Sequence, residues 1–113
     1  MTRPSVVIIC GQPFRVEGVA EGQPLAPATA NNPMTDLGCL QLSQQRIAIR
    51  DGQAPNAERD TLLHEVLHSI LHMTSAVSVF KHAEREEVVV NALAVGVLDV
   101  LRRNPAFVTW LTE

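Results

Sequence analysis

The stretch 57–80 contains neither proline nor glycine and carries apolar residues at helical spacing, and it limits the possible folds more than any other segment. Leu63, Leu67 and Ile70 recur three or four residues apart, which predicts one apolar face of a helix. We expect this helix to span about 57–73. Because its apolar face must be covered, the chain needs a second layer that packs against it.

Within this predicted helix, His64, Glu65 and His68 form the pattern His-Glu-x-x-His. Residues four apart lie on the same face of a helix, so both histidines point the same way and could hold one metal ion. Glu65 is turned by about 100° from His64, which puts a carboxylate at the flank of that ion. The pattern therefore predicts a zinc site with two histidine ligands and Glu65 as the general base.

A second long helix is predicted from about 81–83 to Arg103, where Asn104-Pro105 ends it. Glutamates stand at its start and arginines at its end, which is the order that the helix dipole favours. The nearly continuous apolar run 88–98 predicts that this helix is buried on most sides. We expect 106–111 to form a short terminal helix whose apolar side chains dock on the core, namely Phe107, Trp110 and Leu111.

The first half of the chain has segments typical of strands, at 5–10 and 14–17, and a hairpin with arms 38–42 and 46–50. In the second arm the isoleucines face one side and the arginines the other, which predicts a partly solvated edge strand. The segment 18–33 reads as a surface loop that could border the active site. The expected fold class is α+β, with a small antiparallel sheet packed on the motif helix and on a second long, buried helix.

Composition excludes several classes of protein and suits a single domain over 1–113. The net charge is −3, the basic residues are scattered, and the chain has one Trp and no Tyr, so nucleic-acid binding is disfavoured. The longest apolar run is about half of what a membrane span needs. Cys10 and Cys39 lie in apolar segments, which favours buried thiols in a reducing compartment. We therefore expect a soluble, cytoplasmic protein. The oligomeric state stays open.

A catalytic zinc normally takes three protein ligands, so one ligand is still to be found. His72 lies too far along the same straight helix to share the ion, and we expect it at the surface or beside a ligand. Glu87 shares a helix face with Asn91 and with the small Ala94, which would let the two helices approach. Glu84 lies on the same side one turn earlier and stays open as the alternative. Glu86 is expected to face solvent.

The segments 61–68 and 87–94 together resemble zincin metallopeptidases of the gluzincin kind, and more closely the small ImmA/IrrE-like proteins of bacteria and phages. In that family a glutamate in an E-x-x-A-N-x-F-A segment is the third zinc ligand. Glu87 corresponds to this glutamate, Asn91 to the asparagine and Ala94 to the last alanine, while valine and leucine replace the other alanine and the phenylalanine. The resemblance covers roughly 38–101 and implies a minimal zincin-like peptidase that acts on a peptide or protein.

We therefore expect Zn²⁺ held by His64, His68 and Glu87, with a peptide substrate that adds as a strand along 46–50. A donor for the developing oxyanion is also needed. The chain has no Tyr, so the candidates for that donor or for support of the ligands are His72, His82, Arg85 and Asn91. Two alternatives stay open. One is a zinc-binding regulatory or interaction module of the same fold that turns over no substrate, and the other is a helical protein without metal.

Overall fold

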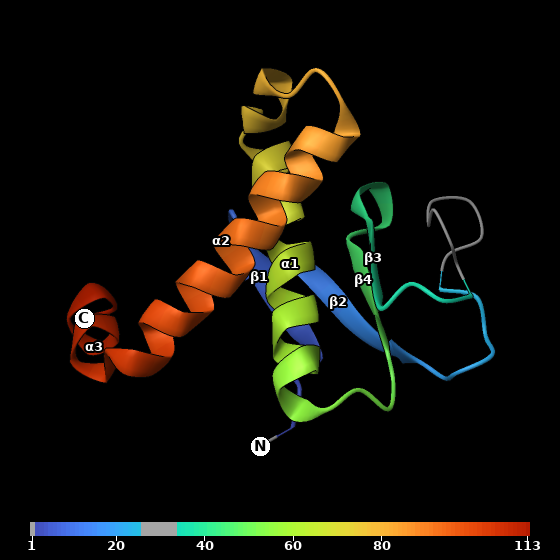
Figure 1. Ribbon diagram of the computed structural model, residues 1–113, viewed down its shortest axis with the longest axis horizontal. Coiled ribbons are helices and arrows are strands. Elements are labelled where there is room, and N and C mark those ends of the chain that lie inside the picture. Colours follow the sequence, from blue (N-terminus) through green and yellow to red (C-terminus); the bar gives the residue numbers. More distant parts are fainter. Residues whose placement is uncertain (1, 26–33) are drawn as a thin grey trace.

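The computed structural model of the chain describes residues 2–25 and 34–113. In this part of the chain one four-stranded sheet is followed by two long helices and a short one (Figure 1). The strands are β1 (Val6–Ile9), β2 (Gln12–Val19), β3 (Gly38–Gln41) and β4 (Arg46–Arg50), and the helices are α1 (Pro55–Met73), α2 (Ala83–Arg103) and α3 (Pro105–Leu111). Two 3-10 turns, Leu42–Gln44 and Ala76–Val79, join β3 to β4 and α1 to α2.

The expected α+β class is confirmed, but the sheet is mixed and not antiparallel. Its strand order is β1-β2-β4-β3, and β2 pairs with β4 in parallel, with Val16 opposite Ile47. The β3–β4 hairpin is antiparallel as predicted. After β2 the chain passes to the outer strand β3, and β4 then returns between β3 and β2. The alternation of side chains within single strands does not reveal this order. The loop expected at 18–33 begins later, since β2 extends to Val19, and residues 26–33 lie outside the described part.

β4 is an interior strand, so the prediction of a partly solvated edge at 46–50 is wrong. Ile47 and Ile49 do share the face toward α1, but Ala48 on the other face is fully buried and Arg50 is 5% exposed. The Arg50 guanidinium donates to the backbone carbonyls of Ala20 at 2.9 Å and Asp36 at 3.3 Å. These hydrogen bonds offset the cost of burying the charge. In the described part of the chain, the outer edge on this side of the sheet belongs to β3.

α1 lies across one face of the sheet and covers the main core (Figure 1). Its packing residues are Leu62, Val66 and Met73, not the predicted stripe of Leu63, Leu67 and Ile70, and Ile70 is exposed. Leucine, valine and isoleucine occur on several sides of this helix, so the spacing fitted more than one face. The strand residues of the core are Ile9, Phe14, Val16, Ile47 and Ile49.

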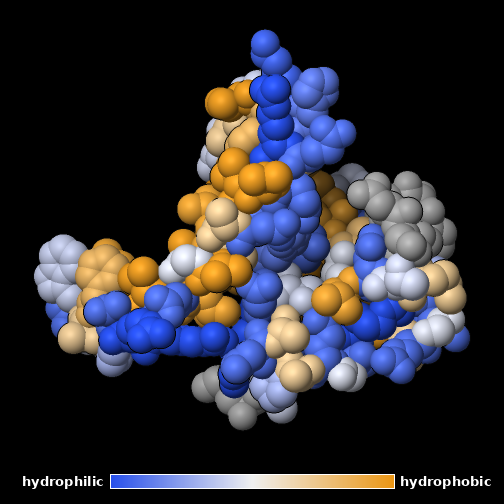
Figure 2. Space-filling view, in the orientation of Figure 1, coloured by the Kyte–Doolittle hydropathy of each residue, from blue (hydrophilic) through white to orange (hydrophobic). Residues whose placement is uncertain are grey.

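α2 packs on α1 near its own N-terminal half and then extends away from the sheet to α3 (Figure 1). Only Glu86, Val90 and Ala94 are buried in it, so the expected burial on most sides is wrong. Apolar side chains gather on the surface of α2 and α3 (Figure 2), and Trp110 is 69% exposed. The predicted terminal helix exists, but it lies against the end of α2 and not on the core. No described helix, α2 included, has the length and apolar character to cross a membrane.

The two cysteines differ in their surroundings. Cys39 in β3 is buried, as expected. Cys10 is exposed, which contradicts the prediction, because the strand ends at Ile9 and the chain turns sharply there. Cys10 and Gly11 both have positive φ angles, of 49° and 80°, in this turn between β1 and β2.

At Gly38, the first residue of β3, the strand and α1 lie so close that a side chain would not fit without a shift of its neighbours. A Cβ atom at this position would lie 2.8 Å from Thr61 Cγ2 and 3.2 Å from Glu65 Cγ. Both neighbours belong to α1, and Thr61 and Glu65 are themselves buried. The missing side chain of Gly38 therefore sets how closely α1 can pack against the strand beside it.

Gly38→Ala should lower the free energy of unfolding by about 1–3 kcal/mol, the usual cost of an extra methyl group in a packed interface. Gly96→Ala is the matched control, since a Cβ atom there meets nothing within 4 Å. It lies inside α2, where alanine is favoured over glycine by up to about 1 kcal/mol. Urea unfolding of both variants measures the two effects. Equal stability of Gly38→Ala and the parent would contradict the close approach.

Candidate metal centre

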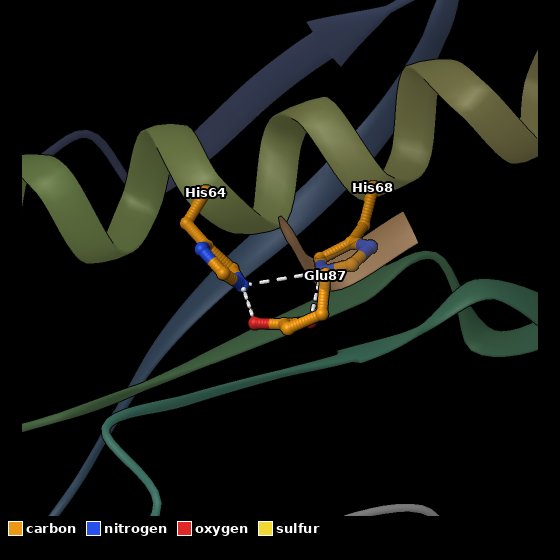
Figure 3. Close-up of side chains that lie close together, drawn as sticks. All are labelled: His64, His68 and Glu87. Carbon is orange, nitrogen blue, oxygen red and sulfur yellow. Dashed lines mark hydrogen bonds and ion pairs between the residues drawn. The ribbon is translucent and has the colours of Figure 1, made fainter. Parts of the chain in front are cut away.

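His64 and His68 point from α1 toward Glu87 on α2, and the three side chains meet at one point (Figure 3). The two Nε2 atoms lie 3.1 Å apart. Glu87 Oε1 is 2.8 Å from His64 Nε2, and Glu87 Oε2 is 2.9 Å from His68 Nε2. A tetrahedral zinc ion with bonds of about 2.0–2.1 Å holds its ligand atoms about 3.3 Å apart. The cluster is therefore close to the size that such an ion requires.

Local structure explains why α2 reaches these histidines. Ser75 has a φ of 63° and, together with the 3-10 turn Ala76–Val79, reverses the chain after α1. Val90 comes three residues after Glu87 and Ala94 four residues after Val90, and both are buried. The small Ala94 side chain allows a close approach of the two helices, so that Glu87 is carried to the histidine pair.

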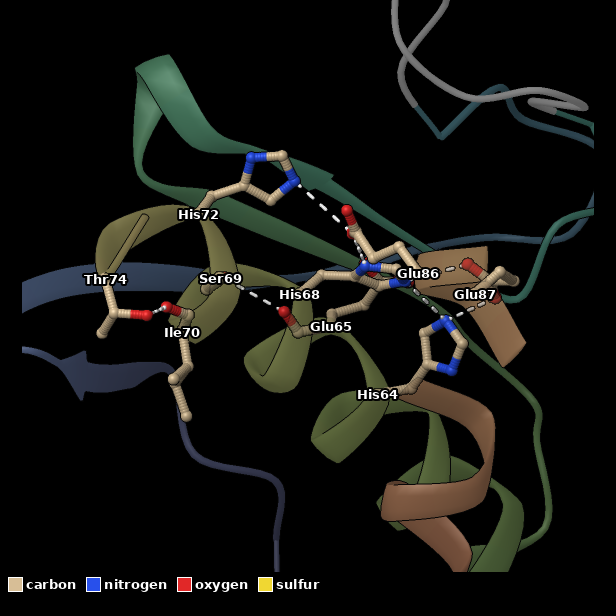
Figure 4. Close-up of polar contacts among 9 residues, drawn as sticks. All are labelled: His64, Glu65, His68, Ser69, Ile70, His72, Thr74, Glu86 and Glu87. Carbon is tan, nitrogen blue, oxygen red and sulfur yellow. Dashed lines mark hydrogen bonds and ion pairs between the residues drawn. The ribbon is translucent and has the colours of Figure 1, made fainter. Parts of the chain in front are cut away.

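Glu86 is also part of this arrangement, and the expectation that it faces solvent is wrong (Figure 4). It is 8% exposed, and its Oε2 atom contacts His68 Nδ1 and lies 3.4 Å from His72 Nε2. The sequence did contain a signal for this. Glu86, Val90 and Ala94 recur every four residues, and these are the three buried positions of α2. The face marked by Glu87, Asn91 and Ala94 leaves Glu86 toward solvent, whereas the buried face is the one that starts at Glu86.

The donor set fits a divalent cation such as zinc. The Glu86 carboxylate can accept a hydrogen bond from His68 Nδ1–H, and this tautomer leaves a lone pair on His68 Nε2. This lone pair faces His64 Nε2 and the Glu87 carboxylate, so a cation placed among the three groups could bind all of them. Burial is the main cause that lowers the pKa of His64, which favours the neutral imidazole that binds metal. Two histidines and one carboxylate also leave a coordination position open.

Glu65 lies in the same cleft, on the side of α1 that faces β3. The cleft has a volume of about 800 Å³ and is bounded by β3, α1 and the first turns of α2. Glu65 is 7% exposed, and burial raises the pKa of its carboxyl to about 7. The negative charge of Glu87 adds to this rise, and His68 opposes it. A carboxyl of this kind can both accept and return a proton near neutral pH.

The remaining candidates separate into two groups. His72, Glu84 and Asn91 line the cleft with the cluster. His82 and Arg85 are exposed and are not among its lining residues. Glu84 is close to the site, as its position one turn before Glu87 suggested, but it does not belong to the three-residue group whose atoms could hold one ion.

No family model matches the chain, and neither a curated protein nor a solved structure matches it. A function is therefore inferred from the His64–His68–Glu87 cluster, the cleft and the buried Glu65. These are features of the chain itself.

Zinc should bind at about one ion per chain, and His64→Ala or His68→Ala should abolish this stoichiometric binding. Glu87→Ala should weaken the affinity by more than about 100-fold, beyond the 10–100-fold that partners outside the ligand shell typically cost. Glu84→Ala is the matched control and should stay within about twofold of the parent. Competition against a chromophoric chelator measures all four variants. A large loss in Glu84→Ala with none in Glu87→Ala would move the third ligand one turn earlier.

The buried Glu65 should make metal-free protein less stable as pH rises. The pKa of Glu65 is about 7 in the fold against 4.5 in an unfolded chain, so the folded state holds a proton that the unfolded state releases. Stability should therefore fall between about pH 4.5 and 7, by about 3 kcal/mol in all. Glu65→Gln should remove this decline, because the amide does not ionise.

The measurement is urea unfolding across this pH range in the presence of a chelator, with the parent and Glu65→Gln compared at each pH. The comparison matters because His64 acts in the opposite direction. Its lowered pKa makes the fold less stable as pH falls, since only the unfolded chain takes up that proton readily. His64 contributes to both proteins and cancels in the difference. A difference that does not change with pH would contradict the buried, raised-pKa carboxyl.

Proposed function

We propose that this chain is a zinc-dependent metallopeptidase that hydrolyses peptide bonds with Glu65 as the general base. The observation that carries the proposal is that a three-residue metal cluster and a buried carboxyl with a pKa of about 7 line one cleft. A module that only bound zinc would gain nothing from this carboxyl, whose burial costs stability above its pKa. This cost favours hydrolysis over the silent binding module.

The chemistry divides between the ion and the protein. Zinc bound by His64, His68 and Glu87 would supply a polarised carbonyl and a water of lowered pKa. The Glu65 carboxylate takes the proton of the attacking water and then gives it to the leaving amine. The pKa of about 7 suits both steps, because the same group must accept a proton and then release it. Of the four candidates for the oxyanion donor or for support of the ligands, His72 and Asn91 line the cleft.

The substrate is proposed to lie along β3. This strand forms the outer edge of the sheet in the described part of the chain and contributes Gly38, Cys39 and Leu40 to the cleft. An extended peptide can add to such an edge through main-chain hydrogen bonds. The earlier expectation of binding along 46–50 fails, since both edges of β4 are already paired.

Charge in the cleft favours a class of substrate. Asp36, Asp60 and Glu84 line it in addition to the cluster, and its described lining contains no lysine or arginine. The negative charge of these lining carboxylates would attract positively charged side chains to the cleft. The proposed substrates are therefore peptides with lysine or arginine close to the bond that is cut.

Glu65→Gln should keep zinc and the fold but lose about 10²–10⁴ of the hydrolysis rate, the usual contribution of a general base. The measurement is cleavage of a mixed peptide library by zinc-loaded protein, read by mass spectrometry, with Glu84→Gln as the control for loss of one negative charge. That control should retain most of the rate. A parent protein that holds zinc and cuts no peptide would favour the silent module, and loss of zinc in Glu65→Gln would make Glu65 a ligand.

A further inference from the structure

We propose that Glu86 is a positioning residue that fixes the tautomer and the orientation of the His68 ring and thereby sets the zinc affinity of the site. The inference rests on the proposed zinc site, because its consequence is measured there. It assigns to Glu86 a role different from that of Glu87, although the two residues are neighbours in the chain.

The geometry around His68 carries this inference. Glu86 Oε2 contacts Nδ1 of the ring, and Glu87 Oε2 lies 2.9 Å from Nε2 on the other side (Figure 4). A single turn of α2 thus provides one carboxylate for each nitrogen of the same imidazole. The two carboxylates differ in exposure, since the Glu86 side chain is 10% exposed and the Glu87 side chain is 49% exposed. The buried carboxylate, that of Glu86, contacts the His68 ring at Nδ1, the nitrogen that faces away from His64 and Glu87.

The contact with Nδ1 decides which nitrogen keeps the proton. A neutral imidazole carries its proton on either nitrogen, and only the nitrogen without it can bind a metal. An ionised carboxylate has no proton to donate, so Glu86 favours the form with the proton on Nδ1. His68 Nε2, which faces His64 and Glu87, is then ready to act as a ligand. Such partners also hold the ring in the plane that the metal needs.

His72 holds Glu86 from the opposite side. Its Nε2 atom lies 3.4 Å from the same Oε2 atom that contacts His68. His68 and His72 are one turn apart on α1, so the Glu86 carboxylate lies between two imidazoles of the same helix. This limits the movement of a side chain that has several rotatable bonds. It also explains why a buried glutamate is accommodated at a helix crossing.

The test compares Glu86→Gln and Glu86→Ala with the parent, and with Glu84→Gln as a matched control. Glu84 is on the same helix as Glu86 and lines the cleft, but it lies outside the metal cluster. Its substitution by Gln removes the same charge as Glu86→Gln. Zinc affinity is measured by chelator competition. Ring ¹⁵N chemical shifts of His68, recorded on metal-free protein, report the tautomer directly, and thermal unfolding of the same samples reports any structural effect.

We expect about 10-fold weaker zinc binding in Glu86→Gln and up to about 100-fold in Glu86→Ala, with Glu84→Gln within about twofold of the parent. The His68 shifts should move from the Nδ1-protonated form toward a mixture in Glu86→Ala, and less in Glu86→Gln, whose amide oxygen can still accept. Should Glu86→Ala fail to fold, Glu86→Gln carries the test, since it preserves the shape of the side chain.

Two results would overturn the inference while the zinc site stands. One is unchanged zinc affinity in both Glu86 variants. The other is a lower melting temperature with an unchanged His68 tautomer, which would make Glu86 a purely structural residue. Failure of the proposed function has a different signature, because the parent itself would then bind no stoichiometric zinc. Without a zinc site the inference fails with it.

Discussion

The crossing of α2 over α1 is the contact on which the site depends. The buried positions of α2, which are Glu86, Val90 and Ala94, determine the side of this helix that faces α1. Because Glu87 follows Glu86 directly, the same packing turns its carboxylate toward the two Nε2 atoms. Rotation of α2 by even a fraction of a turn would separate the two glutamates from His68 together. Packing of an alanine and a valine thus controls the geometry of groups that bear charge.

The sheet packs against a different side of α1, next to the same cleft. There the close approach at Gly38 buries Glu65, and burial keeps its carboxyl protonated at pH values where an exposed glutamate is ionised. A cation bound at the His64–His68–Glu87 cluster would favour the ionised form, so the protonation of Glu65 and the occupancy of the cluster are linked. α1 thus carries two chemically different faces. One faces α2 and suits a metal, and the other faces β3 and suits a base.

The features that could be predicted from the sequence were those set by local pattern. The spacing of His64 and His68, the ends of α2 and the β3–β4 hairpin depend on residues near one another in the chain, and the structure agrees with each. Glu87, and not Glu84, lies with the two histidines in the cluster, and its role as a zinc ligand stays a prediction.

The errors concern relations between distant segments. The alternation of Ile47 and Ile49 does not show that β2 lies beside β4 in parallel. Sequence alone therefore predicts an edge strand where the structure has an interior one. The apolar residues of α2 do not show that, in the described part of the chain, packing on α1 buries only one side of this helix, at Glu86, Val90 and Ala94. The burial of Glu86 depends on the angle at which α1 and α2 cross, which the sequence does not show. The prediction that Glu86 faces solvent is wrong for this reason.

The order of these segments along the chain has a consequence for how the protein folds. The residues of the metal cluster come from a single helical hairpin, with His68 and Glu87 only 19 positions apart. The central pairing of the sheet, between β2 and β4, instead joins segments separated by a long connection, with Arg46 and Glu17 29 positions apart. Closing a short loop costs less chain entropy, and contacts between near neighbours form faster. The helical hairpin can therefore assemble before the sheet that buries Glu65 is complete. In that sequence of events the two histidines meet Glu87 first, and Glu65 enters its cleft last.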